Sequence, residues 1–141
     1  MAGVVRSGSV GYPLTEEQAY ALPPLTLAYV GDAVWELHVR MMLVLAGERQ
    51  PRQLHKLAVG YVKAGAQADR IHALQERLSE REQQVVRRGR NAKSATVPRG
   101  ASVADYRSST GLEALLGYLH LAGQDSRLQE IMQWLIEQGG Q

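Results

Sequence analysis

The chain has 141 residues, of which 45% are hydrophobic, and these values predict one compact domain with an ordinary core. It contains no cysteine, which excludes disulfides, thiolate catalysis and cysteine-ligated metal sites. The net charge of +2 is small but unevenly spread, because six cations face a single anion, Asp105, between Val85 and Arg107. The positive potential is therefore concentrated in one region of the chain.

Residues 1–14 carry neither a leader with a basic start and a long apolar run nor an Arg-rich amphipathic pattern, and we interpret them as a flexible lead-in. Charged residues interrupt every apolar stretch, so we expect no membrane contact and a cytoplasmic protein. Apolar residues recur every three or four positions, whereas no lasting period-two alternation indicates a strand. The sequence therefore predicts an all-α fold, with a single domain over residues 15–138.

The first half of the chain carries clear helix signals. A capping-box pattern at residues 15–18 opens a short helix, which must end before two consecutive prolines. A second helix is predicted over residues 24–45 and is closed by Gly47. A third helical stretch, residues 51–78, contains two glycines, and we expect a bend or a break there.

The second half contains three further helices and one loop. A capping box at residues 79–82 opens a helix that should end around Arg88. The following segment, "RGRNAKSATVPRGAS", is rich in glycine, serine and cations and has no periodicity, which predicts a loop. Ser102 should cap a helix over residues 103–123, and Asp125 should cap the last helix, residues 126–138.

Two carboxylates stand in apolar helices without a cation in reach on their own helix. Asp32 lies in "AYVGDAVWELHVR", where Glu36 and Arg40 are spaced to pair with each other. Glu113 lies in "STGLEALLGYLHLAG", and glycines stand close to both acids. A glycine inside a helix costs about 1 kcal/mol relative to alanine, so a close backbone approach explains these glycines better than chance does. If the two helices cross at their glycines, the two carboxylates face each other.

Facing carboxylates repel each other unless a proton or a cation lies between them. Carboxylate oxygens with water completing the shell suit Mg²⁺, for which Mn²⁺ can substitute, and such ions also bind substrate phosphates. Asp32 and Glu113 are therefore candidate metal ligands and catalytic residues. In the alternative interpretation, each acid is a core residue that pairs with a tyrosine, an arginine or a histidine of another helix.

The segment "RRGRNAKSATVPRG" holds five cations in fourteen residues, which suits contact with a phosphate backbone. It contains no aromatic residue, so a duplex is favoured over stacked single-stranded bases. A solvated surface loop is the alternative interpretation. The candidate RNA-binding residues of this segment are Arg87, Arg88, Arg90, Asn91, Lys93, Ser94 and Arg99.

These motifs resemble a known family. "LAYVGDAVWEL" resembles the signature of ribonuclease III catalytic domains, and "RGRNAKS" with "DYRSSTGLEALLGYL" resembles the compact Mini-ribonuclease III branch of bacteria. The resemblance runs from about Pro24 to Leu135. It implies a ribonuclease III-like helical bundle that forms a homodimer and cuts double-stranded RNA with Mg²⁺, leaving 5′-phosphate and 3′-hydroxyl ends. It also implies that the double-stranded RNA-binding domain of larger relatives is absent.

The resemblance assigns the metal and catalytic roles to Asp32 and Glu113, and it adds Gln67 as an RNA-binding residue. Larger relatives carry two further acids, at positions that hold Ala28 and Thr110 here. Gly65 stands where a basic residue is expected. The role known for the branch, trimming the 23S ribosomal RNA precursor, is the function that we expect, and a ribosomal protein is a possible partner.

Two alternatives from other functional classes remain open at this stage. One is a non-catalytic protein that binds duplex RNA on the same fold. The other is a helical module whose basic loop binds an acidic protein.

Overall fold

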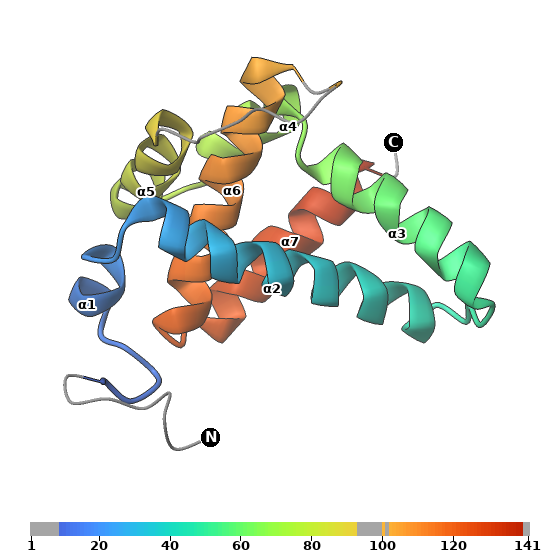
Figure 1. The fold of residues 1–141 in the computed structure, drawn as a ribbon, viewed down its shortest axis with the longest axis horizontal. Helices are drawn as coiled ribbons and strands as arrows, with labels where there is room; N and C mark the ends of the chain where they lie inside the picture. The colour runs from blue at the N-terminus through green and yellow to red at the C-terminus, as the bar shows by residue number, and fades with distance from the viewer. Residues whose placement is uncertain (1–8, 93–99, 101, 140–141) are drawn as a thin grey trace.

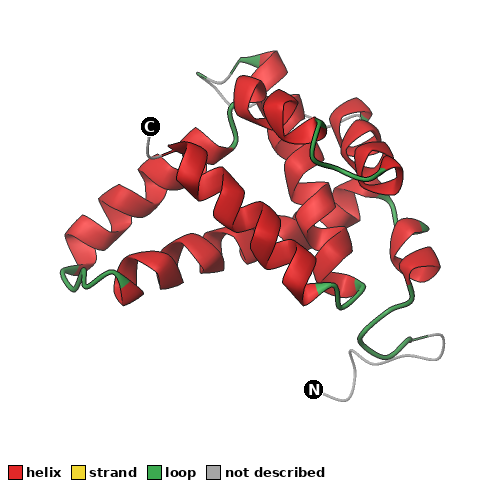
Figure 2. Ribbon diagram, turned by 180° about the vertical axis from the view of Figure 1, so that it is seen from behind, coloured by secondary structure: helices red, strands yellow, loops and turns green. Residues whose placement is uncertain are grey.

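The computed structural model describes residues 9–92, 100 and 102–139, which contain seven helices (Figure 1). No strand occurs in these residues (Figure 2), so the predicted all-α fold is confirmed. In chain order the helices are α1 (Glu16–Tyr20), α2 (Pro24–Leu45), α3 (Pro51–Gly65), α4 (Ala68–Gln75), α5 (Glu80–Asn91), α6 (Val103–Leu121) and α7 (Asp125–Gly139).

Local capping residues begin three of the helices at the predicted positions. The Thr15 hydroxyl accepts a hydrogen bond from the Gln18 amide at the start of α1. The Ser79 hydroxyl accepts from the Glu82 amide at the start of α5, and the Ser102 hydroxyl caps α6 in the same way. These bonds satisfy amide groups that have no partner within the helix.

Other boundaries differ from the sequence prediction. The third stretch does break, and α3 and α4 are separate helices on either side of residues 66–67. Helix α5 continues to Asn91 instead of ending around Arg88, and cations in its last turn complement the helix dipole. Helix α7 includes Asp125 instead of being capped by it. None of the helices in the described residues is long and apolar enough to cross a membrane.

Helix α6 is the centre of the fold, and α2 and α5 pack against it (Figure 1). A Cβ atom added to Gly31 of α2 would lie 1.7 Å from the carbonyl oxygen of Glu113, and one added to Gly117 would lie 1.9 Å from that of Leu27. Only glycine permits this approach of two backbones. The predicted crossing of the two helices at their glycines is confirmed.

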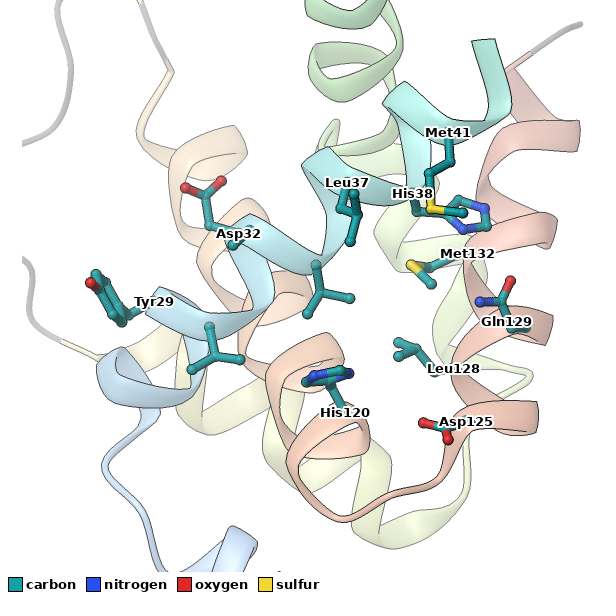
Figure 3. A pocket seen from close by; sticks show the side chains of 13 residues that line it. Tyr29, Asp32, Leu37, His38, Met41, His120, Asp125, Leu128, Gln129 and Met132 are labelled. Atoms are coloured by element: carbon teal, nitrogen blue, oxygen red, sulfur yellow. The ribbon is translucent and has the colours of Figure 1, made fainter. Parts of the chain in front are cut away.

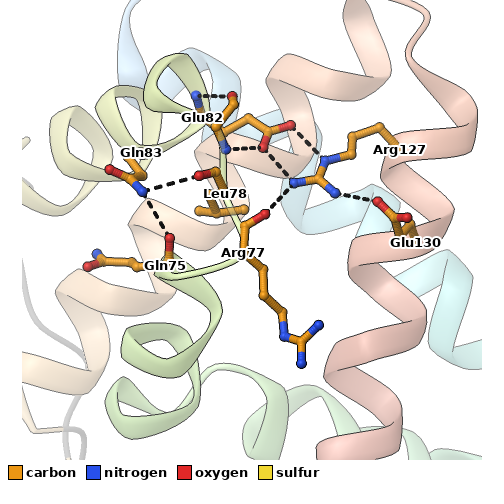
Figure 4. A network of polar contacts seen from close by, with 8 residues as sticks. Gln75, Arg77, Leu78, Glu82, Gln83, Arg127 and Glu130 are labelled. Carbon is orange, nitrogen blue, oxygen red and sulfur yellow. Dashed lines mark hydrogen bonds and ion pairs between the residues drawn. The ribbon is translucent and has the colours of Figure 1, made fainter.

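An ion pair between Glu82 and Arg127 joins α5 to α7 (Figure 4). The Arg127 guanidinium donates to both carboxylate oxygens of Glu82, at 2.9 and 2.8 Å, and to the carbonyl oxygen of Arg77 at 2.7 Å. Burial by itself raises the pKa of Glu82, but the bonds from Arg127 and the Ser79 amide outweigh it and hold this pKa below its ordinary value. Glu82 therefore stabilises the fold as an anion.

The last residues of the predicted lead-in contact the end of α6. The Leu14 amide donates to the carbonyl oxygen of Leu121 at 2.8 Å, and the rings of Tyr12 and His120 lie 5.8 Å apart. Residues 12–14 are therefore packed against the domain, whereas the boundary drawn at residue 15 stays a prediction.

Candidate active site

The two predicted site carboxylates lie together where α2 crosses α6. Asp32 follows Gly31 directly, and the backbone of Gly31 contacts that of Glu113. The Asp32 side chain is exposed, Glu113 is partly buried, and the two carboxyl groups are close enough for Asp32 to raise the pKa of Glu113. The close approach that glycine permits thus brings together two acids that are far apart in the sequence.

The surroundings of Glu113 disfavour its anion. Burial and the neighbouring carboxyl group of Asp32 raise the pKa of Glu113 to about 8. The Ser109 hydroxyl donates to Glu113 Oε1 at 3.1 Å, which opposes the rise. Within the described part of the chain, Glu113 has no ion pair. The pair therefore requires a proton or a cation between its members.

The donor set of this pair fits Mg²⁺ or Mn²⁺. These ions bind through one or two protein carboxylates and keep several waters, whereas structural zinc requires about four protein ligands. No group of three or more metal-binding side chains occurs among the residues that the structure describes. Asp32 and Glu113 would therefore be the protein ligands, and water and substrate would supply the remaining oxygens.

Ala28 and Thr110, the two positions where the sequence resemblance leads one to look for further acids, do not extend the site. Thr110 is only 8% exposed, and its hydroxyl donates to the carbonyl oxygen of Tyr106 at 3.0 Å. Ala28 is 9% exposed and belongs to the core. Neither side chain offers a carboxylate, so the protein ligands reduce to two.

The predicted RNA-binding residues of the basic segment fall into three groups. Arg87 and Asn91 are exposed on the last turns of α5, and Arg90 is half-buried there. Lys93, Ser94 and Arg99 lie outside the described residues. Arg88 is part of the fold, because its guanidinium donates to the carbonyl oxygen of Tyr20 at 2.7 Å and lies over the Tyr20 ring.

Gln67 and Gly65 lie at the α3–α4 break. Gln67 is exposed at the N-cap of α4 and lines a cleft of about 230 Å³ that it shares with residues of α4 and α7, apart from the acid pair. A Cβ added to Gly65 would lie 2.5 Å from the Trp35 ring. The basic side chain expected at position 65 has no room there, because the indole of α2 occupies the space.

Sequence reasoning missed a large apolar cleft between α2 and α7, with a volume of about 710 Å³ (Figure 3). Asp32 and Tyr29 lie at one end of it, and His38 and Met41 at the other. Leu37 and Met41 are 59% and 52% exposed although both are apolar. A signal was present, because the α2 residues Val30, Val34, Leu37, Met41 and Val44 are spaced alternately by four and three.

Comparison with known proteins gives consistent matches over most of the chain. Residues 25–124 match the family described as "Ribonuclease III domain". The chain is 48% identical over 124 residues to the "Mini-ribonuclease 3" of Thermoanaerobacter sp. (strain X514). This match covers 88% of this chain and 87% of that protein. It is 54% identical over 112 residues to the "Mini-ribonuclease 3" of Symbiobacterium thermophilum, and this match covers 79% of this chain and 86% of that protein.

A solved structure gives the same picture for the fold. The crystal structure of a protein from Fusobacterium nucleatum superposes with a TM-score of 0.74 at 28% sequence identity, and the match covers 88% of this chain and 98% of that one.

Proposed function

This chain belongs to the ribonuclease III family and is an endoribonuclease, and we propose that it hydrolyses double-stranded RNA with Mg²⁺ bound by Asp32 and Glu113. The observation that carries the proposal is the pair of facing carboxylates at the α2–α6 crossing, whose electrostatics call for a cation. Family membership favours this function over the two non-catalytic alternatives.

The residues of the pair have different tasks in this mechanism. Asp32 is exposed and meets ion and substrate from solvent, whereas Glu113 is held by the packed backbone of α6. When bound, Mg²⁺ would lower the pKa of a water molecule and offset the charge that builds up on the phosphate. No side chain has to act as a nucleophile. The expected products carry 5′-phosphate and 3′-hydroxyl ends.

The basic end of α5 is suitably placed for binding the RNA backbone beside the acid pair. Gly89 packs on the backbone of Gly111, two positions before Glu113, so the last turn of α5 lies next to this part of α6. We expect Arg87, Arg90 and Asn91 to contact phosphates or sugars there. Lys93, Ser94 and Arg99 extend the same basic segment and are proposed to serve with them, and Arg88 and Gln67 remain proposed contacts.

We further propose that the substrate is the 23S ribosomal RNA precursor, processed in the cytoplasm, with a ribosomal protein as a possible partner. The likeness to proteins named Mini-ribonuclease 3 supports this choice. Purified protein incubated with that precursor should release the mature ends in the presence of Mg²⁺, and sequencing of both fragment ends checks the positions. Cleavage only at unrelated sites would contradict this substrate.

We propose that the enzyme acts as a homodimer through the outer face of α2. The apolar residues of α2 are spaced alternately by four and three, as in helices that pack against each other. Leu37 and Met41 are exposed beside the large cleft and form an apolar surface that a second copy of the chain would cover. A twofold axis would set two acid pairs on one duplex, one for each strand. Replacing Leu37 and Met41 by lysine should give monomers in sedimentation velocity; an unchanged dimer would refute this interface.

Asp32→Asn tests the catalytic proposal. We expect its cleavage rate with Mg²⁺ to fall on the order of a thousandfold, because a lost metal ligand removes several kcal/mol of transition-state stabilisation. Duplex binding should persist. The matched control is Glu36→Gln, one turn further along α2, where the carboxylate is exposed and pairs with Arg40. Cleavage by Asp32→Asn at the rate of the control would overturn the proposal.

A further inference from the structure

Two neighbouring hydroxyls on α6 make different hydrogen bonds. Thr110 donates to the carbonyl oxygen of Tyr106, four residues earlier, which is the usual bond of a hydroxyl inside a helix. Ser109 instead donates forward, at 3.1 Å, to the Oε1 atom of Glu113, one turn later. The Ser109 hydroxyl is thus directed at the half-buried member of the acid pair.

This bond restricts the Glu113 side chain. A glutamate has three rotatable side-chain bonds, and the donor at Oε1 holds one end of its carboxylate, which limits where the second oxygen can lie. Hydrogen bonds from outside the ligand set commonly fix the orientation of ligating carboxylates. Only two carboxylates meet at this site among the described residues, so the orientation of each one has a large effect.

We propose that Ser109 is a positioning residue that holds the Glu113 carboxylate in its metal-binding orientation. The inference rests on the metal site proposed above. Ser109 itself is not a ligand in this arrangement, because its hydroxyl hydrogen is directed at Oε1. Its loss should therefore weaken the binding of the ion without disturbing the packing of α6.

The test compares Mn²⁺ binding to the full-length wild-type protein and to Ser109→Ala by electron paramagnetic resonance in the absence of RNA. Removal of an outer hydrogen bond of this kind should weaken Mn²⁺ binding about 10-fold to 100-fold. Ser109→Thr keeps a hydroxyl at the same position and should restore most of the affinity. Unfolding of all variants without metal, followed by circular dichroism, should show unchanged midpoints.

The matched control is Thr110→Val, which removes the neighbouring hydroxyl while keeping the shape of the side chain. Because that hydroxyl bonds the backbone and not Glu113, Mn²⁺ affinity should stay at the wild-type value. In a Glu113→Gln background, Ser109→Ala should cause no additional loss, since the two residues act through one contact.

The outcomes separate this inference from the proposed function. A wild-type protein that binds no Mn²⁺ would refute the metal site itself. A wild-type protein that binds Mn²⁺, with Ser109→Ala binding equally well, would overturn the positioning role and leave the metal site in place. An equal loss in Ser109→Thr and Ser109→Ala would also count against it, because the hydroxyl would then not be the active group.

Discussion

Glu82 and Glu113 are glutamates in helices of the same core, yet their surroundings are opposite. Glu82 is 5% exposed and receives hydrogen bonds from the Arg127 guanidinium on both oxygens and from the Ser79 amide. Glu113 faces the carboxylate of Asp32 and receives a hydrogen bond from the neutral hydroxyl of Ser109. The comparison separates a carboxylate that serves the fold from one that we propose serves the chemistry.

The difference lies in the charge of the partner and not in burial. Burial alone raises the pKa of both glutamates. At Glu82 the hydrogen bonds outweigh this effect and the pKa falls below its ordinary value, whereas at Glu113 the neighbouring Asp32 adds to it and the pKa rises to about 8. A carboxylate that the protein keeps in such an unfavourable place is a candidate functional group.

Arg127→Met should produce the largest change in stability. Removing the partly exposed Arg127 leaves the charge of the buried Glu82 uncompensated, so the free energy of unfolding should fall by up to about 3–5 kcal/mol. Urea unfolding at pH 7 measures this change. Arg40→Met is the control, because the exposed Arg40–Glu36 pair should contribute less than about 0.5 kcal/mol. An equal fall in the free energy of unfolding in both variants would contradict the prediction that the Arg127–Glu82 pair contributes more to stability than the surface Arg40–Glu36 pair.

The pH dependence of stability should show the opposite signs of the two glutamates. Without divalent ions, folded Glu113 keeps its proton up to about pH 8, while the unfolded chain loses it near 4.5. The contribution of Glu113 to the free energy of unfolding is therefore fully present below pH 4.5 and is lost as the pH rises toward 8. At about 1.4 kcal/mol for each unit of pKa shift, this loss amounts to a few kcal/mol.

Glu82 acts in the opposite direction. Its pKa is depressed, so its contribution is present above pH 4.5 and is lost as the pH falls further. Urea unfolding between pH 3 and pH 9 in the presence of a chelator measures both effects. In Glu113→Gln the free energy of unfolding should no longer fall as the pH rises from 4.5 to 8, while its fall at lower pH should remain. An unchanged fall between pH 4.5 and 8 in that variant would contradict the raised pKa.

Divalent ions should stabilise the protein through the acid pair. At pH 8, Mn²⁺ at a hundred times its dissociation constant should raise the free energy of unfolding by about 2.7 kcal/mol. The increase should be smaller at pH 5, because protons compete with the ion for Glu113. Thermal unfolding with and without Mn²⁺ checks this expectation. The same increase in Asp32→Asn would show that the ion binds elsewhere.

Asp32→Asn should have a small effect on stability, and it should be favourable. Removing a charge that faces Glu113 should raise the free energy of unfolding by about 1 kcal/mol at pH 8 without metal, since Asp32 is exposed and its repulsion is screened by solvent. Chemical unfolding beside the Glu36→Gln control measures the gain. A clear destabilisation would mean that Asp32 supports the fold.

The sequence by itself determined the helices and pointed to the acid pair. Thr15, Ser79 and Ser102 mark helix starts because capping bonds span only three residues. Gly31 and Gly117, costly inside helices, indicated that α2 and α6 approach closely, and the positions of Asp32 and Glu113 followed from that crossing. Signals of this kind are local, so they can be read without the fold.

Only the tertiary structure decided which distant residues meet. Arg88, expected at the RNA, bonds the carbonyl oxygen of Tyr20, 68 positions away, and the Glu82–Arg127 pair joins residues 45 positions apart. The Trp35 ring explains why position 65 is glycine, and the cleft between α2 and α7 exists only once both helices are packed. Such contacts depend on how helices pack, which a periodicity of three or four residues does not encode.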